Sequence, residues 1–327
     1  MAKVLVQQPI HPDALKRLAE EVEVLTPYKA SNPEILEMMP GIDAFLLGVG
    51  IDLGPQEMDL APKLQVIGRH GVGLDNVDLD AATARGIPVV YTPYGPTEST
   101  AEHAFTLILA TARRLSLMDG AVRSGNWAIA KQPRAMGLEL KGKSLGIVGY
   151  GRIGRRLADM CRSALEMSIY VFDPFLDASQ VAKADATPVE DLIELAGMVD
   201  VLSVHVPLTT QTNKMINRDV VQAMKPNAIL INASRGPVVD EEALIEVLKE
   251  DRIFGAGMDV YDPEPPIPDN PLFKFDHVVL TPHIASLTEE GRQLMGLTVV
   301  EGILRVLKAQ QPEYIANPEV WEKRRVF

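Results

Sequence analysis

Ser144-Leu-Gly-Ile-Val-Gly-Tyr-Gly-Arg-Ile-Gly154, followed by Ser168-Ile-Tyr-Val-Phe-Asp173, is the stretch that decides the fold of this 327-residue chain. It reads as a strand, a glycine turn, a helix, a second strand and an acidic residue. The spacing of its glycines fits the G-x-G-x-x-G pattern, which is typical of the first turn in a dinucleotide-binding βαβ unit. Glycines by themselves also mark βα turns that bind nothing. The apolar residues before the turn and the acid after the second strand favour the dinucleotide site.

Each residue of the turn has its own expected task. Gly149 allows the tight turn, Gly151 lets a pyrophosphate approach the backbone, and Gly154 lets the helix pack on the strand. The free N–H groups at the start of the helix, at Arg152 and Ile153, are expected to face the phosphate oxygens.

Asp173 indicates which dinucleotide is bound. It lies 19 residues after Gly154, where a carboxylate accepts hydrogen bonds from the adenosine ribose. A carboxylate at this place repels a 2′-phosphate, so the sequence predicts NAD rather than NADP.

The composition is that of a globular protein with two domains, and it restricts the partners. The formal net charge of −12 argues against nucleic acid. The one cysteine, Cys161, excludes an intrachain disulfide and is expected to fill the core. The N-terminus does not resemble a signal peptide, and no apolar run approaches the ~18 residues of a membrane span. We therefore expect a cytoplasmic protein without a membrane partner.

Strands and helices alternate along most of the chain, which predicts parallel sheets. The helical pattern of residues 99–124, capped by Ser99 or Thr100, and the loop 125–142 precede the glycine turn. The final helix, at about residues 288–310, has no strand after it and is expected to pack back on the first sheet. The strands are expected at residues 4–6, 44–47, 65–67, 89–91, 168–172, 201–205, 228–232, 255–259 and 278–280.

Three later segments each follow a strand and each carry a polar side chain that could face a ligand. They are Asn232-Ala-Ser-Arg-Gly236, Asp259-Val-Tyr-Asp-Pro-Glu-Pro265 and Thr281-Pro-His-Ile-Ala-Ser286. Because ligands of open α/β sheets bind at the carboxyl ends of the strands, we expect Arg235, Glu264 and His283 to meet there.

This set of side chains suits hydride transfer to a 2-oxo acid. The planar guanidinium of Arg235 would hold the carboxylate and polarise the carbonyl. His283 would serve as the general acid, and Glu264 would favour and orient the protonated imidazole. Each residue also has a structural explanation, namely a surface ion pair, an exposed loop acid and a packed histidine. Their joint position after a dinucleotide motif favours the site.

A glycine-rich loop, Gly68-Arg-His-Gly-Val-Gly-Leu-Asp-Asn-Val-Asp78, precedes the helix at residue 99. The backbone N–H groups of Val72 and Gly73 are the best candidates for binding a substrate carboxylate. A tight connection without a ligand is the alternative. His205 ends a strand and could line the cofactor site, whereas His103 is expected to cap or pack a helix. No cluster has the spacing of a zinc or iron–sulfur site.

With these motifs, the chain resembles the D-isomer-specific 2-hydroxyacid dehydrogenase family. That family includes phosphoglycerate, glycerate/hydroxypyruvate, D-lactate, formate and phosphite dehydrogenases. The resemblance covers nearly the whole chain, and four motifs occur in the family's order and spacing. It implies a central NAD-binding Rossmann domain, residues 99–286, and a discontinuous, flavodoxin-like substrate-binding domain, residues 1–98 and 287–327. Both are doubly wound parallel-sheet domains.

The resemblance also implies roles for individual residues. Arg235 would be the substrate clamp, His283 the acid/base and Glu264 its partner, with Val72 and Gly73 also contacting the substrate. A homodimer would form through the NAD domain, largely through residues 99–142. The implied cofactor contacts are Val72, Arg152, Ile153, Asp173, Val206, Ala233 and Asp259. The expected cofactor site also includes Gly149, Gly151, Gly154, Ser234 and Ser286.

Departures from the family pattern bear on the substrate. Phosphoglycerate enzymes usually carry a basic residue in the loop that here reads Leu47-Gly-Val-Gly-Ile-Asp52, although Arg69, Lys131 or Arg134 could supply a charge from elsewhere. The chain ends after its final helix, so we expect no regulatory domain of the kind some phosphoglycerate enzymes have. Formate enzymes usually have Gln in place of Glu264.

We therefore expect a small unphosphorylated 2-oxo acid such as glyoxylate or hydroxypyruvate. Phosphoglycerate is the first alternative. Phosphite oxidation and an NADH-sensing scaffold related to the transcriptional corepressors are weaker ones.

Overall fold

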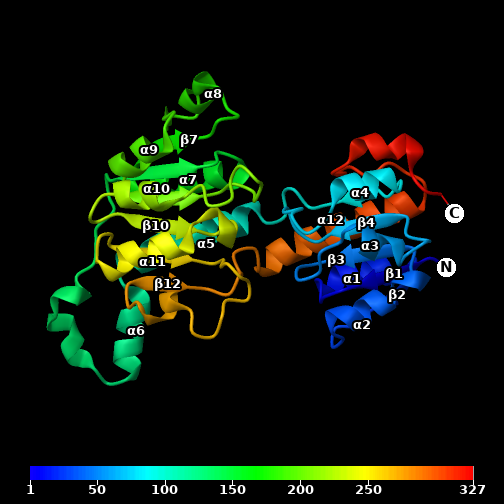
Figure 1. The fold of residues 1–327 in the computed structure, drawn as a ribbon, viewed down its shortest axis with the longest axis horizontal. Coiled ribbons are helices and arrows are strands. Elements are labelled where there is room, and N and C mark those ends of the chain that lie inside the picture. Colours follow the sequence, from blue (N-terminus) through cyan, green and yellow to red (C-terminus); the bar gives the residue numbers. More distant parts are fainter. Residues whose placement is uncertain (327) are drawn as a thin grey trace. The chain divides into compact units, whose positions relative to one another are not determined.

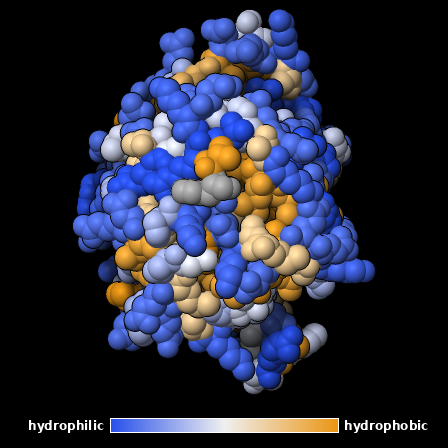
Figure 2. All heavy atoms as spheres, turned by 90° about the vertical axis from the view of Figure 1, so that its right-hand side faces the viewer, coloured by the Kyte–Doolittle hydropathy of each residue, from blue (hydrophilic) through white to orange (hydrophobic). Residues whose placement is uncertain are grey.

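The computed structural model describes residues 1–326, which form two compact α/β units (Figure 1). Unit 1 holds Met1–Thr97 and the chain from Leu287 onward, and unit 2 holds Glu98–Ser286. Hydrophilic residues dominate the face shown in Figure 2, with apolar residues in smaller groups among them. Among the residues that the structure describes, no helix is both long and apolar enough to cross a membrane.

The sheet of unit 1 has five parallel strands in the order β2-β1-β3-β4-β5, which is the flavodoxin-like order that the resemblance implied. Side chains alternate between its two faces, so Leu5 and Phe45 join one buried cluster while Val4 and Leu46 join another. The strands are β1 (Lys3–Val6), β2 (Glu23–Leu25), β3 (Ala44–Leu47), β4 (Val66–Arg69) and β5 (Val89–Val90).

Helices cover both faces of this sheet, as expected for a doubly wound domain. The final helix, α12, lies on β4 and against α1, as the sequence predicted. Gly68 permits this close approach, because a Cβ atom there would lie 2.5 Å from Cδ1 of Ile303. The helices of unit 1 are α1 (Pro12–Ala19), α2 (Asn32–Glu37), α3 (Pro55–Asp59), α4 (Leu79–Ala84) and α12 (Glu289–Leu307), with 3₁₀ turns at Met39–Gly41 and Pro318–Lys323.

The sheet of unit 2 has seven parallel strands in the order β12-β11-β10-β9-β6-β7-β8. Counted from β6, this is the Rossmann order 3-2-1-4-5-6 with one further strand at its end. The order reverses between β6 and β9, and the carboxyl ends of these two strands mark the expected ligand crevice. The strands are β6 (Ser144–Val148), β7 (Ser168–Phe172), β8 (Thr187–Pro188), β9 (Val201–Val204), β10 (Ile229–Asn232), β11 (Gly255–Met258) and β12 (Val278–Leu280).

The helices of unit 2 pack in two layers, one on each face of the sheet. The prediction of a single helix over residues 99–124 was wrong. Arg114 adopts a left-handed conformation with φ 50°, which ends α5 and begins α6, and its guanidinium lies 4.1 Å from the ring of Phe254. The helices are α5 (Thr97–Ala112), α6 (Leu115–Arg123), α7 (Arg152–Leu165), α8 (Ala178–Ala182), α9 (Leu192–Met198), α10 (Arg218–Ala223) and α11 (Glu241–Lys249).

The expected caps and the expected loop were also partly wrong. Ser99 and Thr100 lie buried inside α5, which begins at Thr97, so neither caps the helix. The region predicted as a loop, 125–142, contains 3₁₀ turns at Trp127–Lys131 and Pro133–Ala135. Most strand boundaries agree with the prediction to within one or two residues.

Candidate functional site

The glycine turn after β6 has the geometry that a dinucleotide site requires. Gly149 has φ +91°, and a Cβ atom there would lie 2.8 Å from the carbonyl oxygen of His205. At Gly154 a Cβ atom would lie 2.4 Å from the carbonyl oxygen of Gly149, so only glycine lets α7 approach the turn. At Gly151, by contrast, no atom lies within 4 Å of the added Cβ. The turn therefore has open space where a pyrophosphate would approach the backbone, and it fits a dinucleotide.

Asp173 lies at the carboxyl end of β7 and is hydrogen-bonded to the same turn. Its Oδ2 accepts from the backbone N–H of Tyr150 at 2.8 Å, and its Oδ1 accepts from the N–H of Phe175 at 3.0 Å. The residue is only partly buried. Two backbone bonds thus orient a carboxylate that still has lone pairs for other donors.

His205 and Val206 follow β9, on the other side of the point where the strand order reverses. Cγ1 of Val206 lies 2.7 Å from the position of a Cβ atom on Gly149, so this side chain packs against the glycine turn. His205 Nε2 and the Ser203 hydroxyl are 2.8 Å apart. Burial lowers the pKa of His205 to about 4, so its imidazole is neutral near pH 7.

The turn after β10 carries Ala233, Ser234 and Arg235. The fully buried Asn232, which the sequence analysis did not single out, holds this turn. Its Nδ2 donates to the carbonyl of Arg235 at 2.9 Å, and its Oδ1 accepts from the N–H and hydroxyl of Ser234. Arg235 Nη1 donates to the carbonyl of Ser234 at 2.7 Å. The next residue, Gly236, packs so tightly on the turn after β11 that a Cβ atom would lie 1.7 Å from the carbonyl oxygen of Tyr261.

Glu264 and His283 come together at the adjacent strand ends. His283 Nδ1 is hydrogen-bonded to Glu264 Oε1, and about a third of each side chain is exposed. His283 has φ 53°, a left-handed conformation that costs a residue with a Cβ atom roughly 1–2 kcal/mol. The structure therefore joins the predicted general acid directly to its predicted carboxylate partner.

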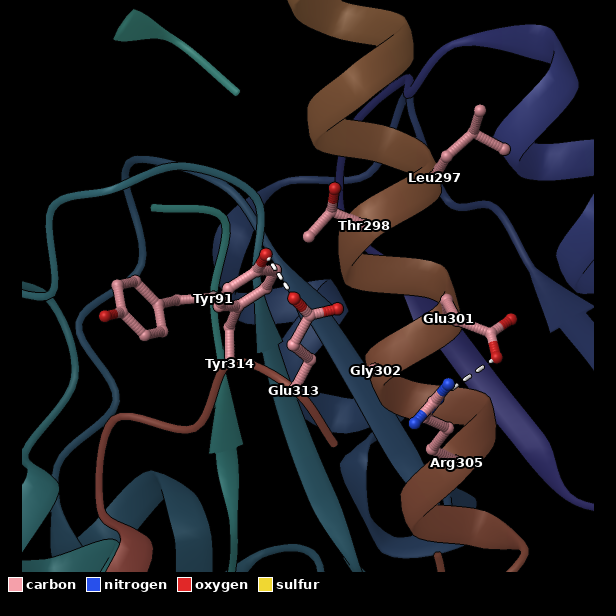
Figure 3. A pocket seen from close by; sticks show the side chains of 8 residues that line it. All are labelled: Tyr91, Leu297, Thr298, Glu301, Gly302, Arg305, Glu313 and Tyr314. Atoms are coloured by element: carbon pink, nitrogen blue, oxygen red, sulfur yellow. Dashed lines mark hydrogen bonds and ion pairs between the residues drawn. The ribbon is translucent and has the colours of Figure 1, made fainter. Parts of the chain in front are cut away.

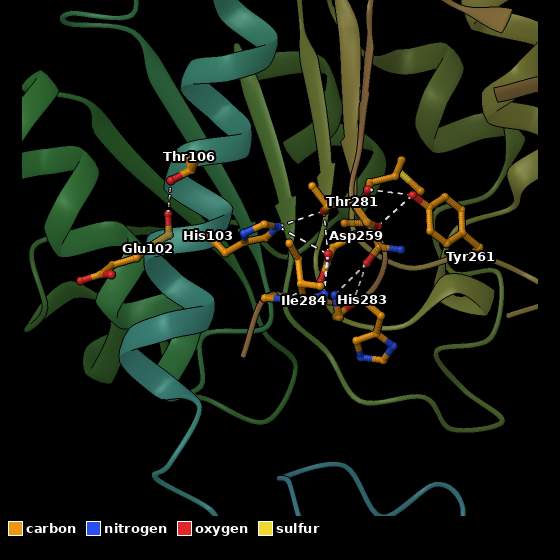
Figure 4. A network of polar contacts seen from close by, with 12 residues as sticks. Glu102, His103, Thr106, Asp259, Tyr261, Thr281, His283 and Ile284 are labelled. Atoms are coloured by element: carbon orange, nitrogen blue, oxygen red, sulfur yellow. Dashed lines mark hydrogen bonds and ion pairs between the residues drawn. The ribbon is translucent and has the colours of Figure 1, made fainter. Parts of the chain in front are cut away.

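The buried carboxylate of Asp259 holds the turn that carries His283 (Figure 4). Its Oδ1 accepts from the N–H of Ile284 and its Oδ2 from the N–H of Ala285, both at 2.9 Å. Its main-chain oxygen accepts from the N–H of His283 at 2.8 Å. Burial acts to raise the pKa of Asp259, but hydrogen bonds from His103, Thr281 and the turn outweigh it and lower the pKa below its usual value. Asp259 is therefore an anion inside the protein, and its expected contact with a cofactor stays a prediction.

The candidate substrate residues Val72 and Gly73 belong to unit 1, in the loop after β4. Val72 is exposed, whereas Arg69 and His70 before it are buried. Burial lowers the pKa of His70 to about 4, and the nearby charges of Arg69 and Arg292 act in the same direction. Ser286 is the last residue of unit 2 and is partly buried.

Unit 1 also has a cavity of about 310 Å³ between α12 and the segments near Tyr91 and Tyr314 (Figure 3). Its acidic residues already have partners, because Glu301 pairs with Arg305 and Glu313 accepts from the Tyr314 hydroxyl. Within residues 1–326, no group of three His, Cys, Asp or Glu side chains is placed to hold a metal ion.

The sheet order and the glycine turn of unit 2 are those of a dinucleotide-binding domain. Comparison with known proteins shows to which protein family this domain belongs. Residues 105–285 match the family described as D-isomer specific 2-hydroxyacid dehydrogenase, NAD binding domain. The chain belongs to the D-isomer specific 2-hydroxyacid dehydrogenase family.

Its relatives include enzymes with two different names. A D-3-phosphoglycerate dehydrogenase of Archaeoglobus fulgidus is 41% identical over 309 residues, which are 94% of this chain and 57% of the relative. The chain likewise spans 60% of a phosphoglycerate dehydrogenase of Methanocaldococcus jannaschii. A glyoxylate reductase of Thermofilum pendens is 39% identical over 330 residues, covering 98% of this chain and 96% of the relative.

Comparison with a solved structure shows that an enzyme with a related name has the same fold. The NADPH-dependent glyoxylate/hydroxypyruvate reductase of Sinorhizobium meliloti, in complex with NADP and malonate, matches with a TM-score of 0.85 at 32% identity. The match covers 100% of this chain and 99% of that one.

Proposed function

We propose that the protein is an NAD-dependent oxidoreductase that interconverts a D-2-hydroxy acid and its 2-oxo acid. The observation that carries this proposal is the hydrogen bond between His283 Nδ1 and Glu264 Oε1, at strand ends next to the Arg235 turn. A general acid, its carboxylate partner and a guanidinium are the groups that reduction of a 2-oxo acid needs.

Each residue of the site has its own proposed role. Arg235 of unit 2 holds the substrate carboxylate. In unit 1, the backbone N–H groups of Val72 and Gly73 are the proposed anion-binding groups. Because Nδ1 of His283 faces Glu264, Nε2 is the nitrogen that gives a proton to the substrate oxygen in reduction and takes it back in oxidation. Glu264 keeps the imidazole in the required orientation. A nicotinamide cofactor, when bound, would supply or accept the hydride at C2 of the substrate.

We propose NAD as the preferred cofactor. The glycine turn, with Arg152 and Ile153 at the start of α7, would hold the pyrophosphate. Asp173 would accept hydrogen bonds from the ribose, and its charge would repel a 2′-phosphate. The other cofactor contacts would come from the strand ends that carry Val206, Ala233, Ser234, Asp259 and Ser286.

A small unphosphorylated acid, such as glyoxylate or hydroxypyruvate, is the proposed substrate. The loop after β3 has no cationic side chain, and amide groups fix its backbone. Gln7 Nε2 donates to the carbonyl of Val49 at 2.8 Å, and Asn76 Nδ2 donates to the carbonyls of Gly48 and Ile51. A fixed loop that offers no cation to a phosphate group supports a small unphosphorylated substrate. D-3-phosphoglycerate is the alternative, which the names of several relatives favour.

We further propose a cytoplasmic homodimer formed through unit 2. Its support is a series of exposed apolar side chains on α5, α6 and the 3₁₀ turns that follow, since large exposed apolar groups mark interaction surfaces. Trp127 is 76% exposed and Met136 is 73% exposed. Light scattering of the purified protein distinguishes a dimer from a monomer, and Trp127→Glu should weaken the dimer.

The function is tested by NADH and NADPH oxidation against glyoxylate, hydroxypyruvate, pyruvate, longer 2-oxo acids and 3-phosphohydroxypyruvate. We expect NADH-dependent turnover of an unphosphorylated acid. His283→Ala should lower kcat by about 10²–10⁴-fold while NADH still binds, and Arg235→Ala should lower both substrate affinity and turnover.

His277→Ala is the matched control, because this histidine packs against Phe275 outside the proposed machinery. A clear preference for the phosphorylated acid would refute the proposed substrate. NADH binding without turnover of any acid would favour phosphite oxidation or a sensing scaffold.

A further inference from the structure

A chain of hydrogen bonds connects helix α5 to the turn that carries His283. His103, on the second turn of α5, places Nε2 3.0 Å from the Thr281 hydroxyl and 3.4 Å from Asp259 Oδ1. The Thr281 hydroxyl is itself 2.6 Å from Asp259 Oδ1. Figure 4 shows these side chains directed toward one another from α5 and from the residues that follow β11 and β12.

The direction of these hydrogen bonds follows from the number of protons available. Asp259 is an anion that only accepts, so the single hydroxyl proton of Thr281 is donated to it. The Thr281 oxygen must then accept from His103, and this requires a proton on His103 Nε2. The bonds therefore run from His103 through Thr281 to the carboxylate.

Asp259 in turn determines the conformation of the His283 turn. Its main-chain oxygen and its two carboxylate oxygens accept from the consecutive N–H groups of His283, Ile284 and Ala285. The carboxylate is fully buried, so water does not replace a lost partner and the orientation depends on the donors around it. The left-handed conformation of His283, which directs its ring to Glu264, is held by this arrangement.

We propose that His103 and Thr281 are positioning residues that keep the Asp259 carboxylate oriented and thereby hold the acid/base imidazole of His283 in register with Glu264. This inference rests on the proposed function for its catalytic consequence. Its structural part, the fixed turn, is measurable without substrate or cofactor.

The test compares two pairs of variants with a matched control in the full-length protein. His103→Ala and Thr281→Val remove the donors, whereas His103→Gln and Thr281→Ser retain an N–H or O–H group. Thr111→Val is the control, because this threonine is also buried in α5 and its hydroxyl has no partner among the described residues. Thermal unfolding confirms that each variant folds.

The first measurement is amide hydrogen exchange of Ile284 and Ala285 in the protein without cofactor. We expect exchange to become about tenfold faster in His103→Ala and Thr281→Val, as for the loss of one hydrogen bond. His103→Gln, Thr281→Ser and Thr111→Val should stay close to the original protein. Unchanged exchange in both His103→Ala and Thr281→Val overturns the proposal.

The second measurement is kinetic. We expect kcat to fall about tenfold to a hundredfold in His103→Ala and Thr281→Val, as for a small displacement of a catalytic group. Restored kcat in His103→Gln and Thr281→Ser supports positioning. Faster exchange with an unchanged kcat refutes the catalytic part. If the original protein turns over no 2-oxo acid, the proposed function fails, and hydrogen exchange alone decides whether His103 holds the turn.

Discussion

Replacing Gly236 by alanine tests whether the turns after β10 and β11 must be in direct contact for the site to work. A Cβ atom at this position would lie 1.7 Å from the carbonyl oxygen of Tyr261, whereas an ordinary contact is about 3.5 Å. The two turns would therefore have to separate by roughly 1.8 Å. Gly236 is not among the glycines with positive φ, so alanine adds this collision without a dihedral penalty.

The displacement falls on the proposed catalytic residues. Arg235 precedes Gly236, and the turn that begins at Tyr261 leads to Glu264, so the clamp moves away from the partner of His283. Misplacement of a catalytic group by about 1 Å can lower the rate about 10²-fold, and overpacking costs about 1–3 kcal/mol of stability. We expect Gly236→Ala to lower kcat/KM for the 2-oxo acid by at least about 10²-fold and to lower Tm by several degrees.

Steady-state kinetics with NADH and thermal unfolding measure these two effects. Gly197→Ala is the control, because a Cβ atom at this exposed position of α9 would lie at an ordinary 3.5 Å from the carbonyl of Ala223. An alanine inside a helix should raise stability slightly there. If Gly236→Ala folds with an unchanged Tm and an unchanged kcat/KM, the contact between the turns does not position the site.

Three further predictions concern other parts of the chain. Asp173→Ala should raise the ratio of NADPH to NADH efficiency roughly tenfold, since it removes a charge that repels the 2′-phosphate, and a constant ratio of kcat/KM values would contradict this role. Burial lowers the pKa of His70 to about 4 in the folded protein, so between about pH 6.5 and 4 the unfolded chain binds one more proton than the folded chain. The free energy of unfolding should therefore fall as the pH drops through that window, by up to roughly 3 kcal/mol. His70→Phe should make the free energy of urea unfolding less dependent on pH in this range, and an unaltered pH dependence would argue against this role of His70. Burial raises the pKa of Cys161 to about 12, so a thiol reagent at pH 8 should label it only as fast as the protein opens, and rapid labelling of the folded protein would show that the thiol is accessible.

The sequence predicted the fold well where local pattern and tertiary structure agree. The run before Gly149, the acid at Asp173 and the repeated βα units were sufficient to predict two parallel sheets, because strands buried on both faces are nearly continuous apolar runs. The break between α5 and α6 was missed for the opposite reason. Arg114 carries no glycine or proline signal, and its left-handed conformation accompanies a contact with Phe254, which is distant in sequence.

Prediction of the candidate site was also limited by contacts between residues that are distant in sequence. Arg235, Glu264 and His283 were identified because each lies in the segment that follows an apolar strand. The roles of the residues that hold them were not identified from the sequence. Asn232 and Thr281 are common in turns, and only the three-dimensional structure shows that their side chains bind the neighbouring backbone and Asp259.

Asp259 illustrates why such residues are difficult to assign from sequence. An acid after β11 can either face a ligand or turn into the protein. The sequence of β11 before it is the same in both cases, so the sequence does not distinguish them. Its carboxylate accepts from the residue after β12 and from the His283 turn, and His103 of α5 lies 3.4 Å from it. A buried carboxylate requires such donors to remain charged. We therefore propose that the polar network around Asp259 belongs to the candidate site and fixes the geometry of the pair formed by His283 and Glu264.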